Sequence, residues 1–286
     1  MSKKILGRLG NNRGHWVGDG FPVRSLFSYH AQGAAVSPFL LLDYAGPHVF
    51  SPADQPRGVG QHPHRGFETV TIVYDGEVSH KDSAGNGGTI GPGDVQWMTA
   101  GGGIIHEEFH SAAFTKTGGP FRMVQLWVNL PAKDKMVAGG YQGIVSDQIP
   151  VAEFDGGKAR IIAGQFGEAK GPARTFTPVN VWDVRLKADA DVTLDLPEGH
   201  NALIVVLTGH VTVGGTHAGE AEVIQLSAEG AGIDVHADGD AMILVLTGAP
   251  IDEPIAGYGP FVMNTETEIR QAIDDFNSGR FGGIAA

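Results

Sequence analysis

The chain contains no cysteine. Disulfide bonds, thiolate metal ligands and cysteine nucleophiles are therefore excluded. Any bound metal must be held by nitrogen and oxygen atoms. Long apolar runs are missing as well, since none approaches the roughly 18 apolar residues that a membrane-spanning helix needs. The opening segment, Met1 to Arg8, carries charges without an apolar signal core behind it. We therefore expect a soluble, cytoplasmic and monomeric protein with no membrane partner.

Positive charge is scarce. The chain has 20 lysines and arginines against 32 acidic residues, which gives a formal net charge of −12. Proteins that bind nucleic acid usually neutralise phosphates with a basic surface, so direct nucleic-acid binding is not expected. A protein partner, by contrast, is compatible with this charge.

Short strand-like runs fill the 286 residues, and glycine is abundant at 43 positions. Examples are the alternating run from Phe67 to Tyr74 and the run from Met123 to Val128. Turn signals such as Asp75-Gly76 and Pro92-Gly93-Asp94 separate the runs. Regular short strands with such turns predict an all-β protein built from antiparallel barrels or sandwiches.

The second half of the chain repeats the first. Ile72 to Val78 has the same form as Val205 to Val211, with Gly76 aligned to Gly209. Under this offset the polar residues of the first copy fall on unlike residues: His62 on Asp195, His64 on Pro197 and Glu68 on Asn201. We expect two tandem barrels, with residues 1–144 binding a metal and residues 145–286 free of metal.

A short helix is expected near the C-terminus. Thr265-Glu266-Thr267-Glu268 is a capping-box pattern, and apolar residues follow at helical spacing from Ile269 to Phe276. Gly279 then ends the pattern. The division into residues 1–144 and 145–286 assigns this helix to the C-terminal barrel, and we expect it to pack on the outside of a barrel.

His62 and His64 form half of a candidate metal site. Successive side chains of a strand point to opposite faces, so these two imidazoles share a face. Glu68 has the same parity. We expect Glu68 either to lie beside the site, where it could accept a proton, or to be a hydrogen-bond partner in the core, rather than to be a ligand.

A second segment, Gly103 to Glu108, offers the other half. By the same rule His106 and Glu108 share a face, while Glu107 points away. Three imidazoles and one carboxylate suit a first-row divalent metal, and an octahedral ion would keep two positions open.

Other motifs have simpler interpretations. The string from His106 to His110 matches the H-E-x-x-H pattern of zinc proteases, but that pattern works only on a helix and here follows a glycine turn and a β-branched pair. His110 is expected to pack or to face solvent. Arg65 either orients a carboxylate or lies on the surface. The remaining histidines show no ligand spacing: His15, His30, His48, His80, His200, His210, His217 and His236.

Several ordered segments resemble the signature of the pirin family, a branch of the cupin superfamily. They are 62–70 (HPHRGFETV), 96–101 (QWMTAG), 103–108 (GIIHEE), 125–130 (QLWVNL) and 259–265 (GPFVMNT). The resemblance implies two cupin barrels and an iron site in the first. The ligands it implies are His62, His64, His106 and Glu108.

The resemblance also implies two alternative functions. One is a quercetin 2,3-dioxygenase-type oxygenase that cleaves a flavonol with dioxygen, with Glu108 or Glu68 taking the proton of the substrate hydroxyl. The other is a metal-dependent regulatory protein that acts on a transcription factor or a metabolic enzyme without turnover. Iron(II) is the expected metal, and manganese, nickel, copper and zinc accept the same ligands.

Overall fold

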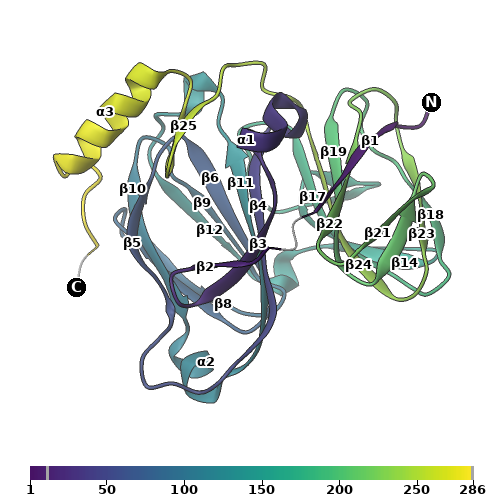
Figure 1. Cartoon of the computed structure of the whole chain (residues 1–286), viewed down its shortest axis with the longest axis horizontal. Helices are drawn as coiled ribbons and strands as arrows, with labels where there is room; N and C mark the ends of the chain where they lie inside the picture. Colours follow the sequence, from purple (N-terminus) through teal and green to yellow (C-terminus); the bar gives the residue numbers. More distant parts are fainter. Residues whose placement is uncertain (11–12, 285–286) are drawn as a thin grey trace. The chain divides into compact units, whose positions relative to one another are not determined.

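The computed structural model describes residues 1–10 and 13–284, and most of them lie in β-strands (Figure 1). The chain forms two compact units, each assembled from three segments. The histidine unit comprises Gly14–Val23, Leu42–Ser146 and Asp252–Ala286. The apolar unit comprises Met1–Arg13, Arg24–Leu41 and Asp147–Ile251.

The histidine unit is built around a seven-stranded and a four-stranded antiparallel sheet. The larger has the order β12-β9-β6-β11-β4-β3-β2, the smaller the order β5-β10-β7-β8, and β25-β26 form a separate hairpin. The strands are β2 (His15–Val17), β3 (Phe21–Ser28), β4 (Phe39–Phe50), β5 (Gly58–His64), β6 (Phe67–Asp75), β7 (Val78–Asp82), β8 (Gly87–Ile90), β9 (Val95–Thr99), β10 (Ile104–His110), β11 (Gly119–Asn129), β12 (Gly140–Ile144), β25 (Ala256–Tyr258) and β26 (Phe261–Met263).

The apolar unit repeats this plan. Its sheets have the orders β1-β22-β19-β24-β17-β14-β13 and β18-β23-β20-β21, with a small β15-β16 hairpin. The strands are β1 (Ile5–Gly10), β13 (Val151–Phe154), β14 (Gly157–Ala163), β15 (Gln165–Phe166), β16 (Ala169–Lys170), β17 (Val179–Leu186), β18 (Asp191–Leu194), β19 (Asn201–Thr208), β20 (His210–Val213), β21 (Thr216–Gly219), β22 (Glu222–Leu226), β23 (Ile233–Ala237) and β24 (Ala241–Gly248).

Few helices accompany the strands. They are α1 (Tyr29–Gln32), α2 (Ala112–Thr117), α3 (Glu266–Asn277) and the 3-10 turns η1 (Gly33–Val36), η2 (Ala132–Asp134) and η3 (Ser146–Gln148). The predicted capping box is confirmed, because the Thr265 hydroxyl accepts from the Glu268 backbone and the Glu268 side chain accepts from the Thr265 backbone. Among the described residues, no helix has the length and apolar character to cross a bilayer.

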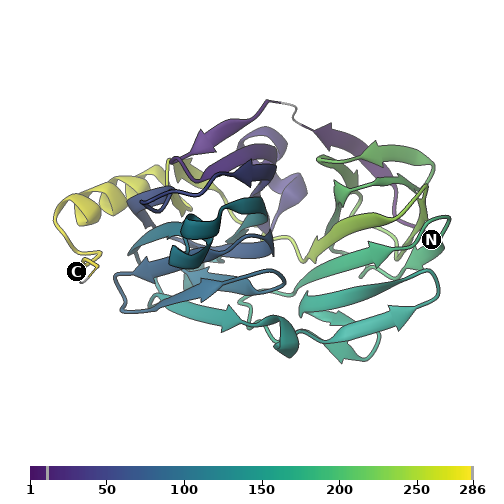
Figure 2. The ribbon, with the colours of Figure 1, turned by 90° about the horizontal axis from the view of Figure 1, so that it is seen from below.

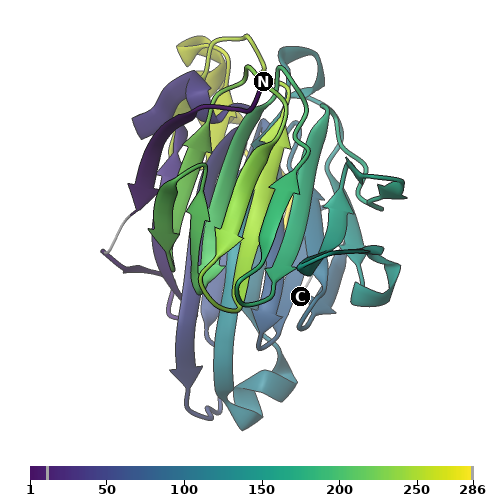
Figure 3. The ribbon, with the colours of Figure 1, turned by 90° about the vertical axis from the view of Figure 1, so that its right-hand side faces the viewer.

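The two ends of the chain correct the predicted division at residue 144. Strand β1 pairs with β22 through Ile5 and Leu226, so the first strand belongs to the apolar unit (Figure 3). Helix α3 packs on the β25-β26 hairpin and belongs to the histidine unit, beside the blue strands in Figures 1 and 2. The predicted boundary lies close to the observed one between Ser146 and Asp147, but the assignment of the two ends was wrong. Segments distant in sequence complete the sheet edges, and a repeat pattern does not reveal this.

The strand orders also show where the ungapped alignment of the repeats fails, because Asp195 and Pro197 lie beyond the end of β18, whereas His62 and His64 lie within β5. In the smaller sheets β18 takes the place of β5, and β23 takes the place of β10. The buried or partly buried residues of β18 and β23 include Val192, Leu194 and Val235, and Val192 pairs with Val235 as His62 pairs with His106. These apolar residues line or pack against the core of the apolar unit, which explains why no ligand group lies there among the described residues.

Candidate metal centre

Strands β5 and β10 bring three histidines together. His106 lies opposite His62, and Ile104 lies opposite His64, in the antiparallel register of the two strands. The ring centroids of His62 and His106 are 4.2 Å apart, and each lies 4.9 Å from the ring of His64. One ligand nitrogen from each ring falls within 4.8 Å of the others. The shared face inferred from strand parity is therefore present in the structure.

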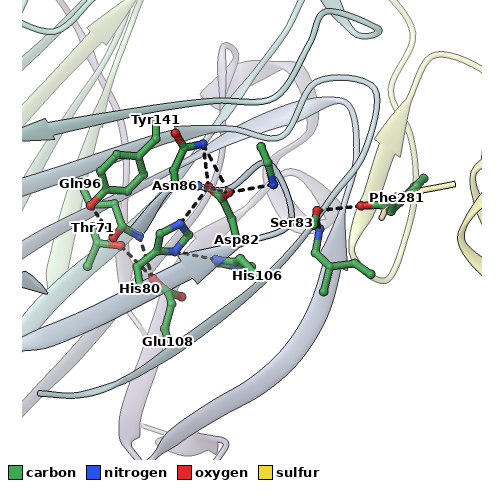
Figure 4. Close-up of polar contacts among 12 residues, drawn as sticks. Thr71, His80, Asp82, Ser83, Asn86, Gln96, His106, Glu108, Tyr141 and Phe281 are labelled. Carbon is green, nitrogen blue, oxygen red and sulfur yellow. Dashed lines mark hydrogen bonds and ion pairs between the residues drawn. The ribbon is translucent and has the colours of Figure 1, made fainter. Parts of the chain in front are cut away.

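Glu108 lies two residues after His106 on β10, on the same buried face. The burial pattern of β10 alternates along the whole strand, which leaves Glu107 partly exposed and Glu108 buried. The register of β5 and β10 shifts between His106 and Glu108, which is typical of a β-bulge. Glu108 Oε1 accepts hydrogen bonds from Gln96 Nε2 at 3.1 Å and from Thr71 Oγ1 at 3.4 Å. These donors come from the larger sheet, so the carboxylate reaches across the barrel interior (Figure 4).

His80 also lies beside the site, although it shows no ligand spacing in the sequence. It lies on β7 directly opposite Glu108, and its side chain is completely buried. Within the described residues, His80, His106 and Glu108 form a second possible ligand group, which shares His106 with the first. Alternation in the run 78–82 signals a buried face, but the pairing of β7 with β10 that makes His80 relevant is a tertiary feature.

Each of the three clustered imidazoles has its Nδ1 atom engaged. His62 Nδ1 lies 2.8 Å from the Gly60 carbonyl oxygen, and His64 Nδ1 lies 3.4 Å from that of Pro260. His106 Nδ1 lies 3.3 Å from His80 Nδ1. A carbonyl can only accept, so the first two rings carry hydrogen on Nδ1 and keep a lone pair on Nε2.

The chemistry of this group fits a divalent metal. His106 Nε2 is buried without any hydrogen-bond partner, which is costly unless something else occupies its lone pair. Burial, reinforced by the neighbouring His62, lowers the pKa of His64 to about 3. Burial likewise lowers the pKa of His106 well below its usual range, and His64, His62 and His80 add to the shift. The two buried rings are thus neutral at physiological pH, the state in which imidazole binds metals.

Glu68 does not lie beside the site, which corrects that prediction, and it has instead the alternative role of a buried hydrogen-bond partner. Thr71, three residues along β6, points to Glu108, so Glu68 lies on the opposite face of the strand. Its Oε1 accepts a hydrogen bond from Thr99 Oγ1 at 2.7 Å. The parity argument failed because Gly66 separates β5 from β6 with a φ of 86°, and the alternation does not continue through this turn.

Arg65 and His110 have structural contacts. Arg65 is buried, with Nε donating to the Gly102 carbonyl at 2.7 Å and Nη2 lying 2.9 Å from Asp275 Oδ2. It therefore ties α3 to the turn after His64 by holding the Asp275 carboxylate, which agrees with the first predicted role, whereas the predicted surface position is wrong. His110 Nε2 bonds the Gly20 carbonyl within an aromatic cluster, which agrees with the expected packing role. The H-E-x-x-H string lies on a strand, so its protease interpretation is excluded as expected.

A two-sheet β-barrel with converging imidazoles in its interior defines the class of metal-binding cupin barrels. Comparison with known proteins gives the same class: the Pirin family profile matches residues 20–128, and that of the Pirin C-terminal cupin domain matches residues 181–282. The chain belongs to the pirin family.

Three relatives show how close the similarity is. A Pseudomonas aeruginosa protein provisionally named a quercetin 2,3-dioxygenase is 58% identical over 281 residues, covering 98% of each chain. A pirin-like protein of Solanum lycopersicum is 39% identical, covering 98% of this chain and 92% of its own. The crystal structure of a quercetin 2,3-dioxygenase from Acinetobacter baumannii is 56% identical, covers both chains completely and superposes with a TM-score of 0.97.

Proposed function

We propose that the chain is a metal-dependent oxygenase of the quercetin 2,3-dioxygenase type, which opens the ring of a flavonol with dioxygen. The observation that carries the proposal is the buried, unpartnered Nε2 atom of His106 within a cluster of three imidazoles. The two close relatives with quercetin 2,3-dioxygenase in their names support this substrate class.

In this proposal His62, His64 and His106 hold the ion, with Glu108 as the fourth ligand. A divalent ion bound here, which we propose is iron(II), would favour ionisation of a coordinated substrate hydroxyl and offer open positions for substrate and dioxygen. Glu108 has its Oε1 atom held by Gln96. Its other oxygen is left to bind the ion or to accept the proton of the flavonol hydroxyl.

The surroundings of the histidines suit a planar aromatic substrate. Trp127 lies on β11 with its ring centroid 5.4 Å from His64 and 4.3 Å from Phe67. Trp127 keeps part of its surface exposed, while Phe67 and His64 are buried. A partly exposed indole beside candidate ligands offers a stacking surface for a flavonol ring.

The test combines metal content with turnover. Freshly purified protein is analysed for bound metals and then assayed for quercetin loss and oxygen uptake. His62→Ala and Glu108→Gln should lose both bound metal and quercetin consumption, whereas the exposed His217→Ala should keep both. Wild-type protein that binds one metal per chain but leaves quercetin unchanged, with every metal tried, would overturn the oxygenase proposal. It would favour the regulatory alternative.

A further inference from the structure

A buried chain of three side chains leads away from the candidate metal ligands. Asp82 Oδ2 lies 3.1 Å from His80 Nε2, and His80 Nδ1 lies 3.3 Å from His106 Nδ1. The side chains of Asp82 and His80 are completely buried, and His106 is inaccessible to solvent. Figure 4 shows His80 between its two partners, with the ring of Tyr141 beside it. That ring stacks on His80 at 5.0 Å with an interplanar angle of 15°.

Asp82 is held as a hydrogen-bond acceptor. Its Oδ1 atom accepts from the backbone N–H groups of Ala84 and Asn86, both at 2.9 Å. The side-chain amide of Asn86 donates to Oδ1 at 3.3 Å and to Oδ2 at 3.2 Å. A carboxylate that receives this many donors can only accept from the next group, so the hydrogen between Asp82 and His80 belongs to His80 Nε2.

The direction of the remaining bond follows. A neutral imidazole with hydrogen on Nε2 has its lone pair on Nδ1, so His80 accepts from His106 Nδ1. His106 then carries its hydrogen on Nδ1 and presents the lone pair of Nε2, the buried atom that lacks a partner. The ring is thereby in the same tautomer as His62 and His64, whose Nδ1 atoms face carbonyls.

We propose that Asp82 and His80 are positioning residues that set the tautomer and ring orientation of His106 so that Nε2 faces the metal. Both nitrogens of His80 are used in this chain, so His80 acts through His106 and is not itself a ligand. This choice places the ion with His62, His64 and His106, keeps Glu108 as the proposed fourth ligand, and excludes His80 from binding the ion. The inference depends on the proposed metal site and is independent of the flavonol chemistry.

The equivalent strand of the apolar unit supports a linked role. Strand β20 takes the place of β7 in the strand order, and its two buried residues are Val211 and Val213, which lie opposite Ala237 and Val235. The unit that lacks the histidine ligands also has no counterpart of His80 and Asp82 on this strand. A role in general packing of the barrel would not require this joint loss, because aliphatic residues fill the buried positions of β20.

The first measurement is made on the full-length metal-free protein with 15N-labelled histidine. Long-range 1H–15N spectra report which nitrogen of each ring carries hydrogen, and the expected result is Nδ1–H for His106 and Nε2–H for His80. Asp82→Asn is nearly isosteric but can donate to His80 Nε2, which would reverse both bonds and place the hydrogen of His106 on Nε2. Wild-type protein with Nε2–H on His106 would overturn the proposal, even if no variant folded.

The second measurement is the affinity for Co²⁺, determined by competition with a chromogenic chelator and by the visible spectrum of the bound ion. Asp82→Asn should weaken Co²⁺ binding by roughly 10- to 100-fold, the usual effect of losing a partner of a metal-bound histidine. His80→Ala should do the same. His80→Asn should restore much of the affinity, because its amide oxygen can replace His80 Nδ1 as acceptor.

Coupling between the two positions distinguishes positioning from a merely structural effect. In the His80→Asn background, the additional change Asp82→Asn should have little further effect on Co²⁺ affinity. His217→Ala provides the control for a surface histidine. Full Co²⁺ affinity of Asp82→Asn would overturn the proposal. So would an equal loss of affinity on changing Asp82→Asn in wild type and in the His80→Asn background. Failure of wild-type protein to bind Co²⁺ would instead refute the metal site. The tautomer measurement would still decide the direction of the hydrogen bonds from Asp82 through His80 to His106.

Discussion

Gly66 is a position at which one methyl group should have a large effect. It has a φ of 86°, and a Cβ atom added there would lie 2.0 Å from the Val262 carbonyl oxygen and 2.8 Å from Met263 Sδ. The first contact is with backbone and cannot be relieved by rotating a side chain. Gly66→Ala therefore requires β26 to move away from the turn that follows His64.

The cost can be worked from the contacts of β26. A left-handed backbone costs a residue with a Cβ about 1–2 kcal/mol. Moving Val262 also breaks two hydrogen bonds. Its N–H group donates to the Arg65 carbonyl at 3.0 Å, and its carbonyl accepts from Lys135 Nζ at 2.9 Å. At about 1 kcal/mol for each bond, Gly66→Ala should lose about 3–4 kcal/mol of unfolding free energy. The melting temperature should fall by about 10 °C.

Gly60→Ala is the matched control in the neighbouring strand. Gly60 has no atom within 4 Å of a built Cβ and no left-handed backbone, so its effect should stay within about 0.5 kcal/mol. Both variants are compared by calorimetry and urea unfolding at pH 7, with Co²⁺ affinity as a second readout because the turn carries His64. Equal stability of the two variants would refute the argument from the contacts of β26.

Three further predictions concern charge and metal. Burial lowers the pKa of Lys135 to about 8, so the folded protein carries a cost of about 3 kcal/mol below pH 8 that is relieved as the pH rises to about 10.5. The unfolding free energy of Lys135→Met, measured with urea, should not rise over this pH range. An equal rise in wild type and variant would contradict the prediction. Burial raises the pKa of Glu68 to about 7, although Thr99 opposes the shift. The unfolding free energy of Glu68→Gln should therefore equal that of wild type below pH 4.5 and exceed it by up to about 3 kcal/mol above pH 7. The variant should also retain bound metal, and loss of metal would contradict the assignment of Glu68 to the opposite face. Metal at 100 times its dissociation constant should add about 2.7 kcal/mol to unfolding, and both chelation and His106→Ala should abolish the gain measured by calorimetry.

The parts of the site that follow from local geometry were predictable from the sequence. Strand parity placed His62 beside His64 and selected Glu108 over Glu107, because alternation holds within an uninterrupted strand. The same rule failed for Glu68, where the left-handed Gly66 interrupts the strand. The all-β class, the two tandem β units and the capped helix followed from turn spacing, the repeat and the capping box, and the resemblance to pirins added the cupin class.

Features that depend on strand pairing were not predictable. His80 is relevant only because β7 lies beside β10, and a single sequence does not reveal which strands are neighbours. The assignment of β1 to the apolar unit has the same origin. The ungapped repeat also gave Asp195 and Pro197 as equivalents of the histidines, whereas both residues lie beyond the end of β18, the strand that takes the place of β5.

The place of β1 has a consequence for biosynthesis. Its partner β22 begins at Glu222, more than two hundred residues downstream of Ile5. A ribosome would expose the first strand long before its neighbour is made, and such distant pairings form slowly. During translation the leading segment must therefore wait for its native partner strand, and the sheet edge that it completes can close only after β22 has been made.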